Sequence, residues 1–323
     1  MKVLHLTPKF FGAYGFGLGK VVQNLVRFGL GEARDPKREF IDYKDYDVIH
    51  VHDYFYSNQA LWAKRRLGKP VVFDVHLPRS NWWAERRLAR EADVTLVHSN
   101  WASRLVLPYK PRKLVIIPCG VEPEWVKDPR DPHFKDKVAI FWGRHVYQKG
   151  LDVLLHAWKS IQGQVPDARL YIAGTSGVTQ SYRNLARRLG LRNVFWLGYV
   201  ERDQLVEIAN KCYLHVVPSR YEPFGIVALE GIAVGLPIVA SRAGGLEEIV
   251  EASRGGLLVP PNPRKLAEAM GELFADPSLA YKLAKWGNSW VRNYTWDKLV
   301  PLYKSLYEMV LGGEKEKGVV ISI

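Results

Sequence analysis

The segment that decides the fold lies between residues 138 and 151 and reads Val138-Ala139-Ile140-Phe141-Trp142-Gly143-Arg144-His145-Val146-Tyr147-Gln148-Lys149-Gly150-Leu151. An apolar run of strand length is followed by a glycine, a polar loop and the start of a helical pattern. This order is typical of a parallel sheet covered by helices. In such sheets ligands bind beyond the carboxyl ends of the strands, so the loop is a candidate binding site.

The same alternation of strands and helices continues on both sides of this segment. Helical patterns separate the apolar runs, for example at residues 20–30, 57–67, 82–90 and 100–107. The pattern predicts an α/β protein with two doubly wound, Rossmann-like halves. The expected strands are 2–6, 47–52, 70–75, 94–97 and 114–117 in the first half, and 138–142, 169–173, 194–196, 213–217, 237–240 and 257–259 in the second.

A proline- and aspartate-rich stretch at residues 120–136 interrupts the regularity and has the composition of a linker. We therefore expect an N-terminal domain at 1–130 and a C-terminal domain at 131–294. Residues 278–311 show a helical pattern. Residues 295–323 are expected to form a helix that packs back on the N-terminal domain, followed by a short polar tail.

Composition limits the class of protein. Of 323 residues, 47% are hydrophobic and 24% are charged, which is ordinary globular usage. The two cysteines, Cys119 and Cys212, form neither a CxxC motif nor a disulfide framework, so a reducing compartment is expected. No apolar run has the length of a signal peptide or a membrane span, and the expected location is the cytoplasm.

The net charge of +13 is concentrated in residues 61–113, which hold twelve Lys or Arg against four Asp or Glu. A solubilising surface accounts for this excess. The alternatives are an anionic acceptor, a peripheral contact with the inner face of the membrane, and nucleic acid. A basic helix at 82–90 with tryptophans at one end suits a bilayer interface. Because only the charge, and no motif, supports nucleic-acid binding, we do not expect nucleic acid as a partner.

Two segments of the second half carry candidate anion-binding chemistry. Arg144 and Lys149 on one loop could bind a diphosphate from two sides, although both could equally be solvated loop cations. In the segment 218–230, the N–H groups of Phe224, Gly225 and Ile226 open a helix and form a candidate anion site.

Glu230 is the only ionisable residue between Pro223 and Ala240. A carboxylate in so apolar a helix needs a partner, either sugar hydroxyls or a buried salt bridge to a distant Arg or Lys. Seven residues separate Glu222 from Glu230, and this spacing makes the pair of glutamates more specific than either residue alone.

Three features of the first half are weaker. His76 ends an apolar strand, with Asp74 on the same face. The glycine-rich loop with Gly15 and Gly17 lets the backbone lie close to a ligand, but it does not have P-loop spacing. His50 and His52 share one sheet face without a third placed ligand, so we expect no metal and no cofactor.

Together these motifs resemble retaining glycosyltransferases of the GT-B fold and the family 4 type, the group of glycogen and sucrose synthases and many mannosyltransferases. The resemblance implies two Rossmann-like domains with an interdomain cleft. The residues that carry it are Gly143-Arg144 to Lys149-Gly150, Ile172-Ala173-Gly174, Leu197-Gly198, Pro218-Ser219, Glu222-Pro223-Phe224-Gly225 to Glu230, Gly235-Leu236-Pro237 and Gly244 to Glu248, and more loosely Gly15–Gly19, 47–52, His76, Ser99 and 118–121.

The resemblance implies a metal-independent transfer of a hexose from a UDP-, GDP- or ADP-sugar to a hydroxyl acceptor, which is a saccharide, a lipid-linked acceptor or a small molecule. Two alternatives stay open, a sugar-nucleotide epimerase and a noncatalytic nucleotide-sugar-binding module. The implied roles are diphosphate binding and charge stabilisation for Arg144 and Lys149, completion of the phosphate cradle for the amides of Phe224, Gly225 and Ile226, donor-sugar contact for Glu222, the sugar or its reacting centre for His76, and ribose binding for Glu230. Tyr199 and Val200 follow an expected strand end and are candidates for contact with the base. Gly15, Gly17, Gly143 and Gly174 complete the expected donor-binding residues.

Overall fold

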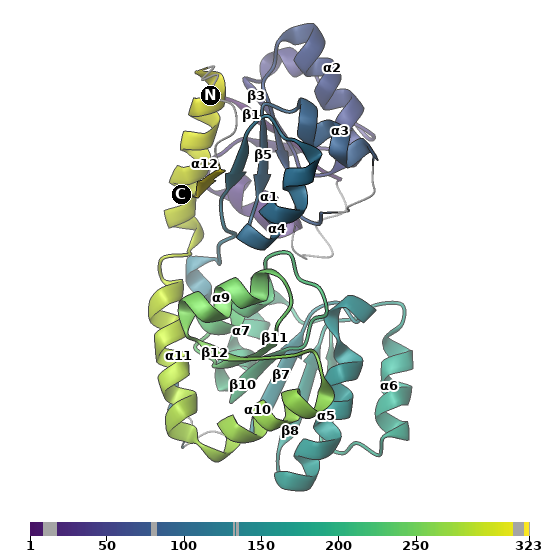
Figure 1. Ribbon diagram of the computed structural model, residues 1–323, viewed down its shortest axis with the longest axis vertical. Coiled ribbons are helices and arrows are strands. Elements are labelled where there is room, and N and C mark those ends of the chain that lie inside the picture. The colour runs from purple at the N-terminus through teal and green to yellow at the C-terminus, as the bar shows by residue number, and fades with distance from the viewer. Residues whose placement is uncertain (9–17, 79–82, 132, 134–135, 313–319, 323) are drawn as a thin grey trace. The chain divides into compact units, whose positions relative to one another are not determined.

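The computed structural model describes residues 1–8, 18–78, 83–131, 133, 136–312 and 320–322 (Figure 1). The chain forms two compact units. Unit 1 contains residues 1–120 and 294–323, and unit 2 contains residues 121–293.

Unit 1 is built on a parallel sheet that has seven strands among the described residues, in the order β13-β6-β5-β4-β3-β1-β2. The strand order reverses between β1 and β3. Its strands are β1 (Val3–Leu6), β2 (Glu32–Arg34), β3 (Val48–Val51), β4 (Val71–Asp74), β5 (Val94–Val97), β6 (Leu114–Ile116) and β13 (Val320–Ser322), and its helices are α1 (Leu18–Arg27), α2 (Ser57–Leu67), α3 (Trp83–Glu91), α4 (Asn100–Val106) and α12 (Trp296–Leu311).

Unit 2 has a parallel sheet with six strands in its described part, in the order β12-β11-β10-β7-β8-β9. Here the order reverses between β7 and β10. The strands are β7 (Val138–Trp142), β8 (Arg169–Ala173), β9 (Val194–Gly198), β10 (Leu214–Val217), β11 (Ile238–Ser241) and β12 (Gly256–Val259), and the helices are α5 (Leu151–Gln164), α6 (Thr179–Arg188), α7 (Arg202–Lys211), α8 (Ile226–Ala233), α9 (Gly245–Ser253), α10 (Pro263–Ala275) and α11 (Pro277–Val291).

The central strands are buried along their whole length and mostly apolar, because helices cover both faces of each sheet; His50, Asp74 and His215 are the polar residues within three of them. The eleven expected strands are confirmed for this reason. Two further strands were not expected. β2 is three residues long and polar, and β13 pairs with β6 from the far end of the chain.

The expected helical stretch at 278–311 is two helices, α11 and α12. α12, yellow in Figure 1, belongs to unit 1, where the Tyr307 hydroxyl lies 2.8 Å from Nδ1 of His50 in β3. The boundary between the N-terminal segment of unit 1 and unit 2 lies at Gly120 rather than at the expected residue 130. Gly120 packs against Trp296 of α12, whereas the Lys127 N–H donates to the Ala233 carbonyl of unit 2 at 2.9 Å.

Candidate functional site

The candidate donor site of unit 2 lies at the carboxyl ends of β7 and β10. These neighbouring strands flank the point where the strand order reverses, which is where ligands bind in open α/β sheets. The loop after β7 carries Arg144 and Lys149, and the loop after β10 carries Glu222.

The two loops are held together by backbone contacts. Gly150 has a φ of +65°, and a Cβ there would lie 1.9 Å from the Pro218 carbonyl oxygen, so only glycine permits this approach. The Arg220 N–H donates to the Gln148 carbonyl at 2.8 Å, and its guanidinium donates to both carboxylate oxygens of Asp152 at 2.8 and 2.6 Å. Arg220 therefore fixes the loop that presents Lys149, although sequence reasoning gave it no role.

Lys149 and Glu222 form an ion pair, and both side chains are largely buried. The sequence assigned Lys149 to the diphosphate and Glu222 to the donor sugar, and the structure places the two side chains in contact. Arg144 is exposed, and within the described residues its guanidinium has neither an ion pair nor a hydrogen bond. The loop thus presents one unpaired cation beside a paired one.

The N-terminus of α8 completes this edge. Gly225 has a φ of +109° and precedes Ile226, the first residue of α8. The Ala228 and Leu229 N–H groups donate to the Gly225 carbonyl at 2.9 and 3.2 Å, which leaves the N–H groups of Ile226 and Val227 without a partner within the helix. A Cβ on Gly245, at the start of α9, would lie 2.6 Å from the Phe224 carbonyl oxygen, and the Gly245 N–H donates to the Glu222 carbonyl at 2.8 Å. The start of α9 therefore supports the turn that presents these groups.

Glu230 is buried in α8 and accepts a hydrogen bond from the Trp142 indole N–H at 3.0 Å. The Trp142 ring stacks on His215 with 3.6 Å between centroids. A neutral indole donor is thus a partner that sequence reasoning did not consider for this carboxylate.

Gly143 and Gly174 mark the closest approach between the ends of β7 and β8. Gly174 has a φ of +106°, and a Cβ there would lie 2.0 Å from the Gly143 carbonyl oxygen. Tyr199 and Val200 follow β9, which is separated from β7 by β8. The Tyr199 ring is exposed, and its hydroxyl lies 3.4 Å from the Glu201 carboxylate. Gly15 and Gly17 lie outside the described residues.

In unit 1, His76 belongs to a cluster around Asp74 at the end of β4. Nε2 of His76 lies 3.3 Å from Asp74 Oδ2, and Nε2 of His98 lies 2.9 Å from Oδ1. Nδ1 of His52 lies 3.5 Å from Oδ2. The expectation that His50 and His52 lack a third placed ligand is therefore wrong, because the sheet places His5 beside both of them and also places Asp74 and His76 beside His52.

The interior position sets the charges of this cluster. Burial lowers the pKa of His5 and of His76 to about 3, so both rings are neutral at physiological pH. Burial alone raises the pKa of Asp74, but the surrounding histidines, among them His98, whose own pKa Asp74 raises well above its ordinary value, outweigh it and hold the pKa of Asp74 well below its ordinary value. A carboxylate thus lies among imidazoles inside unit 1.

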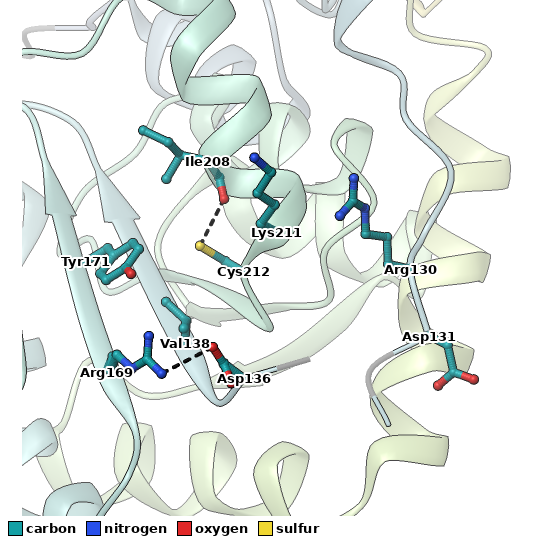
Figure 2. A pocket seen from close by; sticks show the side chains of 9 residues that line it. All are labelled: Arg130, Asp131, Asp136, Val138, Arg169, Tyr171, Ile208, Lys211 and Cys212. Carbon is teal, nitrogen blue, oxygen red and sulfur yellow. Dashed lines mark hydrogen bonds and ion pairs between the residues drawn. The ribbon is translucent and has the colours of Figure 1, made fainter. Parts of the chain in front are cut away.

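A cavity of about 580 Å³ lies at the opposite, amino edge of the unit 2 sheet, where β7 and β8 begin (Figure 2). None of the sequence-predicted site residues lines it. Its lining residues are Arg130, Asp131, Asp136, Val138, Arg169, Tyr171, Ile208, Lys211 and Cys212.

Two parallel, helix-covered Rossmann-like units define the GT-B fold class, and solved structures agree. HepE from Anabaena in complex with UDP-glucose aligns with a TM-score of 0.80 at 18% identity over 96% of this chain and 100% of that one. Sucrose-phosphate synthase from Thermosynechococcus elongatus aligns with a TM-score of 0.75 at 23% identity over 84% of this chain and 75% of the other.

The chain belongs to the glycosyl transferases group 1, whose family model matches residues 126–290, and a glycosyltransferase family 4 model matches residues 21–125. A D-inositol 3-phosphate glycosyltransferase from Acidothermus cellulolyticus is 31% identical over 304 residues, covering 82% of this chain and 68% of the relative. An uncharacterised glycosyltransferase from Methanocaldococcus jannaschii is 29% identical over 282 residues, covering 84% and 78%. The family resemblance of the sequence motifs is thus confirmed.

None of the described helices combines the length and the apolar character that crossing a membrane requires.

Proposed function

We propose that the chain transfers a hexose from a nucleoside-diphosphate sugar to a hydroxyl acceptor, with retention of configuration and without a metal ion at the donor site. The observation that carries the proposal is the placement of Arg144, Lys149 and the N-terminus of α8 on neighbouring loops at the strand-order reversal of unit 2. Family membership and the UDP-glucose bound to HepE support a nucleotide-sugar donor.

The charges of this edge suit a departing diphosphate. Arg144 is unpaired within the described residues and can donate two parallel hydrogen bonds to phosphate oxygens. Lys149 adds a second cation, and its ion pair with Glu222 holds the ammonium group near the same loop. When the bond from the anomeric carbon to phosphate breaks, fixed positive charge stabilises the negative charge that develops on the diphosphate.

Glu230 is proposed to bind the ribose. The Trp142 N–H donates to one oxygen of the Glu230 carboxylate at 3.0 Å. The indole contact also orients the carboxylate before the donor arrives. Retention and metal independence rest on the family resemblance, and a rate that does not increase on addition of Mg²⁺ or Mn²⁺ is the result expected.

The acceptor class follows from charge. Residues 61–113 hold an excess of basic side chains, and one relative is named for D-inositol 3-phosphate. We include an anionic hydroxyl acceptor in the proposal. Location in the cytoplasm, with a peripheral contact at the inner face of the membrane, is a further part of it that cell fractionation tests.

Calorimetric titration with UDP, GDP, ADP and their sugar conjugates tests the donor site. We expect one nucleotide to bind and Arg144→Ala to weaken it about 10- to 100-fold, because a hydrogen bond to a charged group contributes about 1.5–3 kcal/mol. Arg188→Ala, which removes an exposed arginine from the end of α6, is the matched control and should leave the affinity unchanged. No binding by any nucleotide, or equal loss in both variants, would contradict the proposal.

Product analysis separates the two alternatives. A transferase consumes its donor only when an acceptor is present, and nuclear magnetic resonance of the product reports the anomeric configuration. An epimerase converts the donor without any acceptor, and a binding module leaves it intact.

A further inference from the structure

Three atoms inside unit 1 converge with the spacing of metal ligands. His52 Nδ1 lies 3.2 Å from His76 Nε2, and these two nitrogens lie 3.5 and 3.3 Å from Asp74 Oδ2. Tetrahedral zinc with bonds of about 2.0–2.1 Å has ligand atoms about 3.3–3.4 Å apart. The three edges of this triangle therefore match the face of a zinc tetrahedron.

The hydrogen-bond chain behind His52 sets its tautomer. His5 Nε2 lies 2.6 Å from the Leu30 carbonyl oxygen, which can only accept, so in the neutral ring the proton of His5 is on Nε2. His5 Nδ1 is then an acceptor, and it lies 2.9 Å from His52 Nε2, which must donate. In a neutral His52 ring the lone pair is then on Nδ1, the atom that faces Asp74 and His76. An oxygen-anchored outer shell of this kind orients metal-binding imidazoles.

A fourth nitrogen lies next to the triangle. Nδ1 of His50 forms a hydrogen bond with the Tyr307 hydroxyl at 2.8 Å, and Nε2 of His50 lies 3.7 Å from Asp74 Oδ2. Among the described residues, Nε2 of His50 has no hydrogen-bond partner, and its ring is fully buried. An unpaired buried nitrogen is costly, and coordination of a cation would remove that cost.

We propose that His52 Nδ1, Asp74 Oδ2 and His76 Nε2 bind a divalent transition-metal ion of the zinc type, with His50 Nε2 beside the fourth position. Two imidazoles and one carboxylate form a ligand set that zinc accepts. The His76 side chain is 12% exposed whereas those of His52 and Asp74 are 0% exposed, so the ion enters from the His76 side. The donor site of unit 2 shares none of these residues.

The test is a titration of the untagged, metal-free full chain with Zn²⁺, combined with the visible spectrum of the Co²⁺-loaded protein. We expect one Zn²⁺ per chain and the intense d–d bands of four-coordinate Co²⁺. His76→Gln should weaken Zn²⁺ binding by more than about 100-fold, because even the loss of an outer-shell partner costs 10- to 100-fold. His156→Ala removes an exposed histidine of α5 and should leave both readouts unchanged.

Circular dichroism of His76→Gln shows whether the variant is folded. Asp74→Asn is a second variant, which removes the carboxylate ligand instead of an imidazole. Stoichiometric binding that folded His76→Gln loses supports the proposal. Absence of stoichiometric Zn²⁺ binding by the wild-type chain overturns it, and so does equal binding by the wild-type chain and by folded His76→Gln. The assay uses neither donor nor acceptor, so its result is independent of the proposed transferase activity.

Discussion

The two units have the same topology at their strand-order reversals but place different chemistry there. In unit 2 the functional groups stand on loops after β7 and β10, and close backbone approaches at glycines hold those loops together. In unit 1 the polar side chains stand on the strands themselves or just beyond them, as His5 and His50 do on β1 and β3. One fold thus presents an exposed arginine beside a largely buried ion pair on the loops of one unit, and a buried polar cluster on the strands of the other.

The loop-borne groups of unit 2 can adjust their positions, whereas the strand-borne groups of unit 1 are held at fixed positions. Loops tolerate change and can be adjusted to a ligand. Side chains on paired strands are positioned by the register of the sheet, and a shift of one residue would move each of them to the other face. The contrast between the two edges can be tested by substitutions that act on only one of them.

The largest effect is expected from Gly174→Ala in unit 2. A Cβ at this position would lie 2.0 Å from the Gly143 carbonyl oxygen, and φ is +106°. Strain and displacement of the backbone should lower the free energy of unfolding by about 3 kcal/mol or more. Gly163→Ala, within α5 and with open space at its Cβ, should instead increase stability by up to about 1 kcal/mol. Urea unfolding measures both, and wild-type stability of Gly174→Ala would show that the edge does not depend on this approach.

His215 distinguishes an isolated buried imidazole from the clustered ones. Burial lowers the pKa of His215 to about 3, and neither ring nitrogen has a hydrogen-bond partner among the described residues. Below the unfolded pKa of about 6.5, the unfolded chain binds a proton that the native chain excludes. The free energy of unfolding therefore decreases as the pH is lowered. This one group should lower the free energy of unfolding by about 2 kcal/mol between pH 7.5 and pH 5.0.

His215→Leu removes this titration. Urea unfolding at pH 7.5 and 5.0 should show a smaller acid loss in the variant, by about 2 kcal/mol, than in the wild-type chain. The same loss in both would mean that His215 is protonated in the native protein.

The smallest effect concerns the connection between the loops of unit 2. Arg220→Ala removes two hydrogen bonds to Asp152 and one to the Tyr147 carbonyl. Because this ion pair is partly exposed, we expect a loss of only about 1 kcal/mol in stability, with a few-fold weaker donor binding. Arg242→Ala, whose exposed ion pairs with Glu247 and Glu251 are 3.4 and 3.3 Å long, should change neither quantity. Equal effects of the two substitutions would remove the role assigned to Arg220.

The sequence predicted the strands and the fold class because buried parallel strands are continuous apolar runs, as in 138–142. It could not predict β2, whose residues Glu32–Arg34 have no such run. Pairing of Lys149 with Glu222 depends on which strands are neighbours, and that order is not encoded in local patterns. The role of Arg220 was missed for the same reason.

The imidazole cluster shows the same limit. His5, His50 and Asp74 come from three strands, and their meeting requires the order β4-β3-β1. A signal was nevertheless present, because a histidine or aspartate stands at the end of, or inside, several successive apolar strands. A search for polar residues that interrupt buried strands would have found it.

The path of the chain between the units has a consequence for synthesis. The chain leaves unit 1 at Gly120, builds all of unit 2, and returns with α12, whose Tyr303 and Tyr307 are buried. A ribosome therefore completes the second unit before it has made the last helix of the first. The strands that carry His50 and Asp74 are synthesised well before the helix that packs on unit 1. Unit 2 can therefore fold before unit 1 is complete.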